Sequence, residues 1–230
     1  MIPKIIHYIW LGGNPLPKEY ENYIEGWKKL CPDYEIKRHD ETNLNIDINE
    51  YCRQAYDNKK WAFASDVLRY YVLFEEGGIY LDTDVELLKP LDCFLNEKLF
   101  LGFETMDYVA PGLIMGAEKG NKIVKDLLDE YKNRSFINND GSLNLQTICK
   151  YSTNYLVNNG LVLNGKTQHF KTFSVYAIEI FNPTDFNGKV INMTPNTCSI
   201  HHYGASWVKK QSFIVRIFNK LKRIFKRKKK

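Results

Sequence analysis

The feature that most constrains this chain is a short block, residues 62–84, in which a helix, a glycine pair and a strand follow one another. Residues 62–76 (AFASDVLRYYVLFEE) are apolar on almost every side, which predicts a buried helix. Gly77 and Gly78 end that helix, and the apolar run 79–81 predicts a buried strand. Asp82 and Asp84 follow at once. The block therefore predicts an α/β domain whose buried strand delivers two carboxylates at its end.

Other segments continue this alternation along the 230 residues. We expect strands at 4–11, 34–38 and 100–103 and extended backbone at 85–91, with helices at 17–30, 120–132 and 143–159. Residues 161–201 are expected to mix short strands and loops. Strands that alternate with helices predict a mainly parallel sheet with crossover connections.

The cysteines and the N-terminus indicate a reducing compartment. The five cysteines are scattered and include no CxxC pair, which argues against a disulfide framework or a zinc ribbon. Residues 1–13 lack the long apolar core of a signal peptide, and no stretch is long enough to span a bilayer. We therefore expect a cytoplasmic protein.

The C-terminal segment differs in charge from the rest of the chain. Residues 209–230 carry 11 Lys and Arg and no acid; because the whole chain carries +5, residues 1–208 carry −6. Apolar residues recur within the segment at helical spacing, which predicts a basic amphipathic helix: Ile214, Ile217, Phe218, Leu221, Ile224 and Phe225. We expect a globular domain at 1–208 and a tail at 209–230 that holds it on an anionic membrane surface, the inner face of the plasma membrane. Nucleic acid would explain the charge but not the apolar stripe; the stripe packing on the domain itself is the other alternative.

Asp82 and Asp84 are candidate metal ligands. Residues two apart in extended backbone face the same side, so both carboxylates can converge on one point. Hard oxygen ligands of this kind favour Mg²⁺ or Mn²⁺, and a cation would offset the mutual repulsion of the pair. The alternative is two solvated loop acids.

Two further groups of polar residues accompany the pair. Ser65, Asp66 and Arg69 share one face of the predicted helix; they form either an internal ion pair or part of a diphosphate clamp. Near the C-terminus, IHHYGASW (200–207) offers His201 and His202 as further metal ligands, and Ser206 and Trp207 as a hydroxyl and a flat surface for a sugar. The alternative for the histidines is a strand with one ring in the core and one in solvent.

Three blocks of the sequence together resemble glycosyltransferase family 32, the DxD group that includes bacterial capsular-polysaccharide enzymes and Och1-like mannosyltransferases. The blocks are IPKIIHYIWLGG, FASDVLRYYVLFEEGGIYLDTDV and IHHYGASW, which fall between residues 2 and 207. The resemblance implies a GT-A fold, a Rossmann-like nucleotide-sugar domain, with Mn²⁺ or Mg²⁺ at the DxD motif and transfer with retention of configuration.

The resemblance also implies roles for individual residues. Ile9 and Trp10 would meet the base of the donor, and Tyr80 would lie near the nucleotide. Ser65, Asp66 and Arg69 would line the ribose and donor-sugar region, with Asp66, Arg69 and Asp84 as the catalytic candidates. Asp82 would bind ribose and metal, Asp84 the metal, and His201 or His202 would complete the metal site; the spacing to Gly204 favours His201. Ser206 and Trp207 would hold the diphosphate.

The implied function is transfer of a sugar from a nucleotide-sugar to a glycan or lipid-linked acceptor in bacterial surface polysaccharide synthesis. A UDP-sugar is favoured over a GDP-sugar as the donor. Residues 104–190 match the family poorly, and Asp140-Gly141-Ser142 stands in the neighbourhood where the family often has a Gly-Pro pair, so the acceptor is not fixed. Two other functions fit the sequence less well. Phosphohydrolases of the haloacid dehalogenase group have Thr or Val two residues after the second Asp, where this chain has Glu86. A non-catalytic membrane adaptor would leave the polar clusters of the domain unexplained.

Overall fold

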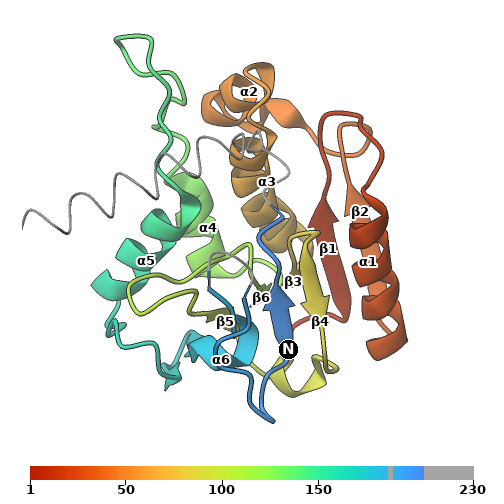
Figure 1. Ribbon diagram of the computed structural model, residues 1–230. Coiled ribbons are helices and arrows are strands. Elements are labelled where there is room, and N and C mark those ends of the chain that lie inside the picture. Colours follow the sequence, from red (N-terminus) through yellow and green to blue (C-terminus); the bar gives the residue numbers. More distant parts are fainter. Residues whose placement is uncertain (186–188, 205–230) are drawn as a thin grey trace, which may run out of the picture.

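The computed structural model describes residues 1–185 and 189–204. Their main feature is a seven-stranded sheet in the order β2-β1-β3-β6-β5-β8-β7 (Figure 1). Its strands are β1 (Ile5–Ile9), β2 (Glu35–His39), β3 (Gly78–Tyr80), β5 (Leu99–Gly102), β6 (Met115–Ala117), β7 (Gln168–His169) and β8 (Ser174–Tyr176). Five of these strands run in one direction, and only β6 and β7 oppose them, so the expectation of a mainly parallel α/β sheet is confirmed.

A second, two-stranded sheet pairs β4 (Val85–Leu87) with β9 (Ser199–His201) in antiparallel register. The extended segment predicted at 85–91 is therefore a strand only over its first three residues. This small sheet brings a segment just after the DxD motif beside a segment near the end of the described chain.

Helices pack against both faces of the main sheet. The α-helices are α1 (Lys18–Leu30), α2 (Glu50–Asp57), α3 (Trp61–Glu76), α4 (Lys122–Asp129), α5 (Ile148–Asn158) and α6 (Ile178–Phe181), and two 3₁₀ turns are η1 (Ile46–Ile48) and η2 (Asp92–Phe94). Helices α2 to α5 bury their apolar side chains in one core, whereas α1, β4 and α6 contribute to a second core. Alternate residues of a strand enter opposite cores, as Ile79 and Tyr80 of β3 do.

One predicted helix boundary needs correction, and one helix was missed. The helix expected at 143–159 begins only at Ile148, because the preceding segment folds back on itself: Ile137 pairs with Leu143, and Asn138 N–H donates to the Ser142 carbonyl at 2.8 Å. Helix α2 was not predicted. Its N-terminal signal was present, since the Asn49 side chain accepts a hydrogen bond from the Cys52 N–H at 2.8 Å, as an N-cap residue does.

The end of α3 and the order of the strands position the functional residues. Gly77 ends the helix with φ +71°, a left-handed conformation that glycine adopts without strain, and β3 starts at the next residue. The chain passes from β1 to β2 on one side of β1 and then returns through α2 and α3 to β3 on the other side. Ligands bind to open α/β sheets at such a reversal, outside the carboxyl ends of the strands. Trp10 follows the end of β1 there, and Asp82 follows close after β3.

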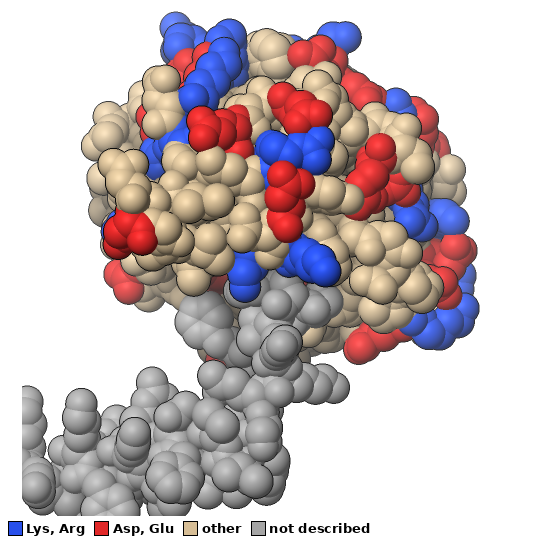
Figure 2. Space-filling model, turned by 90° about the horizontal axis from the view of Figure 1, so that it is seen from above, with Lys and Arg blue, Asp and Glu red and all other residues tan. Residues whose placement is uncertain are grey.

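Within residues 1–185 and 189–204, no helix has the length and apolar character needed to cross a membrane. The face seen in Figure 2 mixes acidic and basic side chains, without a continuous patch of one sign. The predicted tail, 209–230, lies outside the described residues.

Candidate metal and donor site

The structure brings together Asp82, Asp84 and His201. One potential ligand atom from each of these residues lies within 4.8 Å of the others. The register of the small sheet explains the arrangement, because Val85 of β4 pairs with His201 of β9 and thereby places the histidine beside the preceding aspartate. The His201 Nε2 atom lies 3.2 Å from Asp84 Oδ1.

The Asp84 carboxylate is held on two sides. In addition to the contact with His201, its Oδ2 atom accepts a hydrogen bond from the Gly204 N–H at 2.8 Å. Burial alone would raise the pKa of Asp84, but these hydrogen bonds and the His201 charge outweigh that effect and hold the pKa below its ordinary value. The pKa of His201 is raised, because Asp84 opposes the effect of burial on the imidazole. Asp84 is therefore anionic at neutral pH.

This group fits a hard divalent cation. Two carboxylates and an imidazole are a donor set that Mn²⁺ and Mg²⁺ accept. The imidazole also has unused capacity, because its Nδ1 atom is buried without a hydrogen-bond partner among the described residues. Asp82 and Asp84 converge as predicted, but they lie in a turn, closed by the Val85 N–H donating to the Asp82 carbonyl at 3.1 Å, and not in the extended backbone that was expected.

The polar face of α3 adjoins this group. Arg69 Nη2 lies 2.8 Å from Asp66 Oδ1 and 3.4 Å from Ser65 Oγ, as the helical spacing predicted. The same Nη2 atom lies 3.3 Å from Asp82 Oδ1, and the guanidinium stacks over the Tyr80 ring at 4.7 Å. The Tyr80 hydroxyl donates to Asp82 Oδ1 at 3.0 Å. One arginine thus connects the helix to the first aspartate of the DxD motif.

Burial and the contact with Asp82 define the role of Arg69. Its side chain is 4% exposed, so the guanidinium holds Asp66 and Asp82 in place and does not present an open charge to a diphosphate. The internal ion pair, one of the two readings of this face, is therefore present. Burial raises the pKa of Asp66 to about 7 even though Arg69 opposes the shift.

Residues expected to contact the donor base differ in exposure. Trp10 is half-buried; its Nε1–H donates to the Asn14 carbonyl at 2.7 Å, and its ring meets Tyr20 edge-on at 6.0 Å. Part of this indole is therefore exposed to solvent. Ile9, in contrast, is buried in the core, so only its backbone could meet a base.

The second histidine lies apart from the carboxylate pair. His202 Nε2 lies 2.9 Å from Glu86 Oε2, and the ring stacks on Tyr23 at 4.8 Å. Of the two histidines, the geometry thus favours His201 as the metal ligand. Ser206 and Trp207 lie outside the described residues.

Three further residues border the site and were not predicted. The Gly112 carbonyl accepts a hydrogen bond from the Asp82 N–H at 2.9 Å. Tyr203, whose ring lies 4.2 Å from that of His201, donates from its hydroxyl to Glu104 Oε1 at 3.3 Å. Burial raises the pKa of Glu104. Tyr203 belongs to the quoted IHHYG block and could have been singled out, whereas nothing local marks Gly112 or Glu104.

Comparison with known proteins supports a glycosyltransferase. Residues 17–101 match the family described as "Glycosyltransferase sugar-binding region containing DXD motif". "Uncharacterized glycosyltransferase L373" of Acanthamoeba polyphaga mimivirus is 29% identical over 187 residues, which cover 74% of this chain and 73% of the relative. "Inositol phosphoceramide mannosyltransferase 3" of Schizosaccharomyces pombe is 32% identical over 124 residues. That match covers 52% of this chain but only 34% of the relative, so the chain spans about a third of that protein.

A solved structure shows the same fold. "PaToxG Glycosyltransferase" superposes with a TM-score of 0.54 at 18% identity and covers 69% of each chain. Residues 17–101 therefore match the glycosyltransferase family defined by its DXD-containing sugar-binding region, which confirms the resemblance to glycosyltransferase family 32, and the fold is that of a GT-A glycosyltransferase.

Proposed function

We propose that this protein transfers a sugar from a nucleotide-sugar to an acceptor hydroxyl, with retention of configuration and with a divalent cation bound by Asp82, Asp84 and His201. The observation that carries the proposal is the convergence of these three side chains beside the carboxyl ends of β1 and β3. A phosphohydrolase or a non-catalytic adaptor has no support from the family match or the fold.

The residues of the chain divide the work as follows. Asp84, anionic and oriented by Gly204 N–H and His201, presents an oxygen to the cation. Arg69 is a positioning residue, because it holds Asp82 and Asp66 from within the protein. Trp10 offers its ring to the base. A bound Mn²⁺ or Mg²⁺ would stabilise the negative charge that develops on the departing diphosphate.

The donor and acceptor are proposed at the level of class. We take a UDP-sugar as the first donor to test and a GDP-sugar as the second. The S. pombe relative bears the name of a mannosyltransferase that acts on inositol phosphoceramide, so mannose is included among the sugars and a lipid-linked molecule among the acceptors. Surface polysaccharide synthesis is the proposed setting.

The proposed location is the cytoplasmic face of the plasma membrane, with residues 1–208 as the catalytic domain and 209–230 as the anchor. The support is the distribution of charge: every charged residue of the tail is Lys or Arg, whereas residues 1–208 carry a net negative charge. A basic amphipathic segment gains about 1 kcal/mol for each Lys or Arg near an anionic surface.

A screen of UDP- and GDP-sugars, with Mn²⁺ or Mg²⁺ and with release of nucleoside diphosphate as the readout, tests the proposal. We expect release with at least one donor, its loss in excess chelator and its loss in Asp84→Ala. Glu86→Gln is the matched control, because that carboxylate lies two residues on and contacts His202 instead. Full activity of Asp84→Ala, or release of inorganic phosphate from the donor, would refute it.

A further inference from the structure

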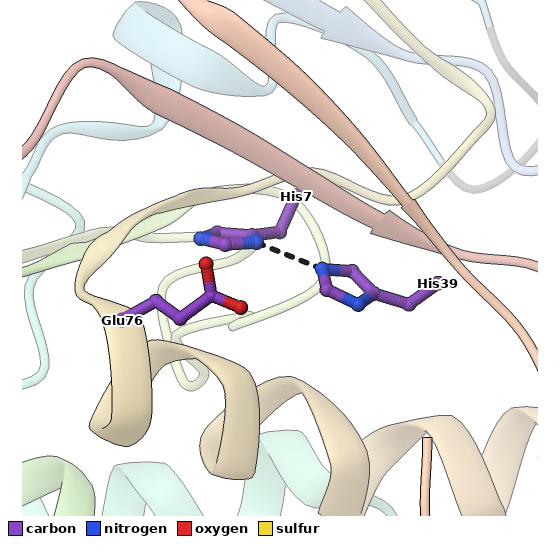
Figure 3. Close-up of side chains that lie close together, drawn as sticks. All are labelled: His7, His39 and Glu76. Atoms are coloured by element: carbon purple, nitrogen blue, oxygen red, sulfur yellow. Dashed lines mark hydrogen bonds between the residues drawn. The ribbon is translucent and has the colours of Figure 1, made fainter. Parts of the chain in front are cut away.

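A second cluster of metal-binding side chains lies outside the DxD group. His7 of β1, His39 at the end of β2 and Glu76 at the end of α3 place one potential ligand atom each within 4.8 Å of the others. Figure 3 shows the two imidazole rings meeting at their nitrogens and the Glu76 carboxylate turned toward them. Three elements that are distant in sequence thus converge on one point.

The hydrogen bonds of His7 orient the ring as a ligand. The His7 Nε2 atom lies 2.8 Å from the Gly77 carbonyl, which can only accept, so Nε2 carries the proton and Nδ1 keeps its lone pair. This Nδ1 lies 2.9 Å from His39 Nε2. Metal-ligating histidines commonly donate their other ring N–H to a backbone carbonyl in this way. Burial lowers the pKa of His7 to about 4 and lowers that of His39, so both rings are neutral at pH 7.

We propose that His7 Nδ1, His39 Nε2 and the Glu76 carboxylate bind a zinc-class divalent cation. Two imidazole nitrogens and one carboxylate suit Zn²⁺ better than Mg²⁺, which prefers oxygen ligands. With Zn–N bonds of about 2.0–2.1 Å in tetrahedral geometry, the two nitrogens would stand about 3.3 Å apart. The rings need to part by only a few tenths of an ångström. His39 would move its proton from Nε2 to Nδ1, so binding releases no proton from this ring.

A pocket beside the cluster gives the ion a route from solvent and leaves one coordination position open. His39 and Glu76 line a pocket of about 460 Å³ between β2 and α3, whose wall also includes Glu75, Asn43 and Tyr71. A cation held by three protein ligands could take a water from this pocket as its fourth. Glu76 pairs with Lys37, but Lys37 Nζ also lies 3.6 Å from Glu35 Oε1. The lysine therefore has a second partner when the Glu76 carboxylate turns to the ion.

The test uses cobalt(II) and zinc(II) on the full chain. Asp82→Asn/Asp84→Asn serves as the parent, so that the DxD group cannot account for the signal. We expect the parent to bind one Co²⁺ with the strong visible absorption of four-coordinate cobalt, and Zn²⁺ to displace it and raise the Tm.

Variants in this parent identify the ligands. His39→Gln and Glu76→Gln keep a side chain that can hydrogen-bond to His7 and Lys37 respectively, and we expect each to weaken binding at least tenfold and to abolish the zinc-induced rise in Tm. Glu75→Gln, which alters the same pocket beside the cluster, should bind as the parent does. If His39→Gln unfolds, Glu76→Gln decides. Two results would overturn the proposal: absence of the cobalt absorption in the parent, or a Glu76→Gln variant that binds as tightly as the parent. Either would show that the cluster only connects β1, β2 and α3 through hydrogen bonds.

Discussion

Gly112 lies against the carboxylate of Asp82 so closely that no side chain fits between them. A Cβ atom at residue 112 would stand 2.9 Å from Asp82 Cγ and 2.5 Å from Arg69 Nη1. We predict that Gly112→Ala displaces Asp82, weakens metal-dependent nucleotide binding at least tenfold and costs about 1–3 kcal/mol of unfolding free energy through overpacking. Calorimetric titration with UDP and Mn²⁺ and urea unfolding measure the two effects.

A glycine elsewhere supplies the control for this substitution. A Cβ at Gly26, within α1, meets no atom within 4 Å. Gly26→Ala should therefore stabilise the protein by about 0.5–1 kcal/mol, because alanine is the better helix former, and should leave UDP binding unchanged. Equal effects of the two substitutions on UDP binding would contradict the assigned role of Gly112.

Arg69 is predicted to be a structural as well as a functional requirement. Arg69→Met removes the cation that Asp66 and Asp82 share, and breaking a buried pair costs about 3–5 kcal/mol when a charge is left behind. Urea unfolding measures the loss. Adding Asp66→Asn to this variant removes the uncompensated charge and should recover part of the stability. A loss below about 1 kcal/mol in Arg69→Met would mean that the guanidinium does not hold the site.

Trp10 is predicted to stack on the donor base. UDP with Mn²⁺ should quench part of the tryptophan fluorescence, and Trp10→Leu should abolish that change and weaken UDP binding more than it lowers the Tm. Trp27 is the matched control, since it is fully buried and its Nε1–H donates to the Val85 carbonyl at 2.9 Å. Trp27→Phe should lower the Tm and keep the quenching. Unfolding of Trp10→Leu would instead assign Trp10 to the core.

The tail is predicted to attach the protein to anionic membranes. In co-sedimentation, the full chain should bind anionic but not neutral vesicles, and salt should reduce the binding because the attraction is electrostatic. A chain that ends at Lys210 should remain in the supernatant and still release nucleotide. Equal vesicle binding by the two chains would show that the anchor lies elsewhere.

Local spacing allowed much of the site to be predicted from the sequence. The two-residue spacing predicts that Asp82 and Asp84 lie close together, although a turn and not extended backbone brings them together, and Asp66 and Arg69 pair because residues three apart adjoin on a helix. The apolar helix 62–76 and the glycine pair likewise encode the end of α3 and the start of β3. Such relations depend on a few neighbouring residues, so the sequence determines them directly.

Only the tertiary structure decided which distant residues complete the site. His201 reaches Asp84 across 117 positions because β4 and β9 pair in one register, and a different register would have presented another residue. Gly112 meets Asp82, and His39 meets His7 and Glu76, because separate elements pack at close range. Burial also placed Arg69 inside the protein, since how far water reaches a side chain depends on every element packed around it. Spacing along the chain carries no record of these contacts, which arise from the packing of the whole domain.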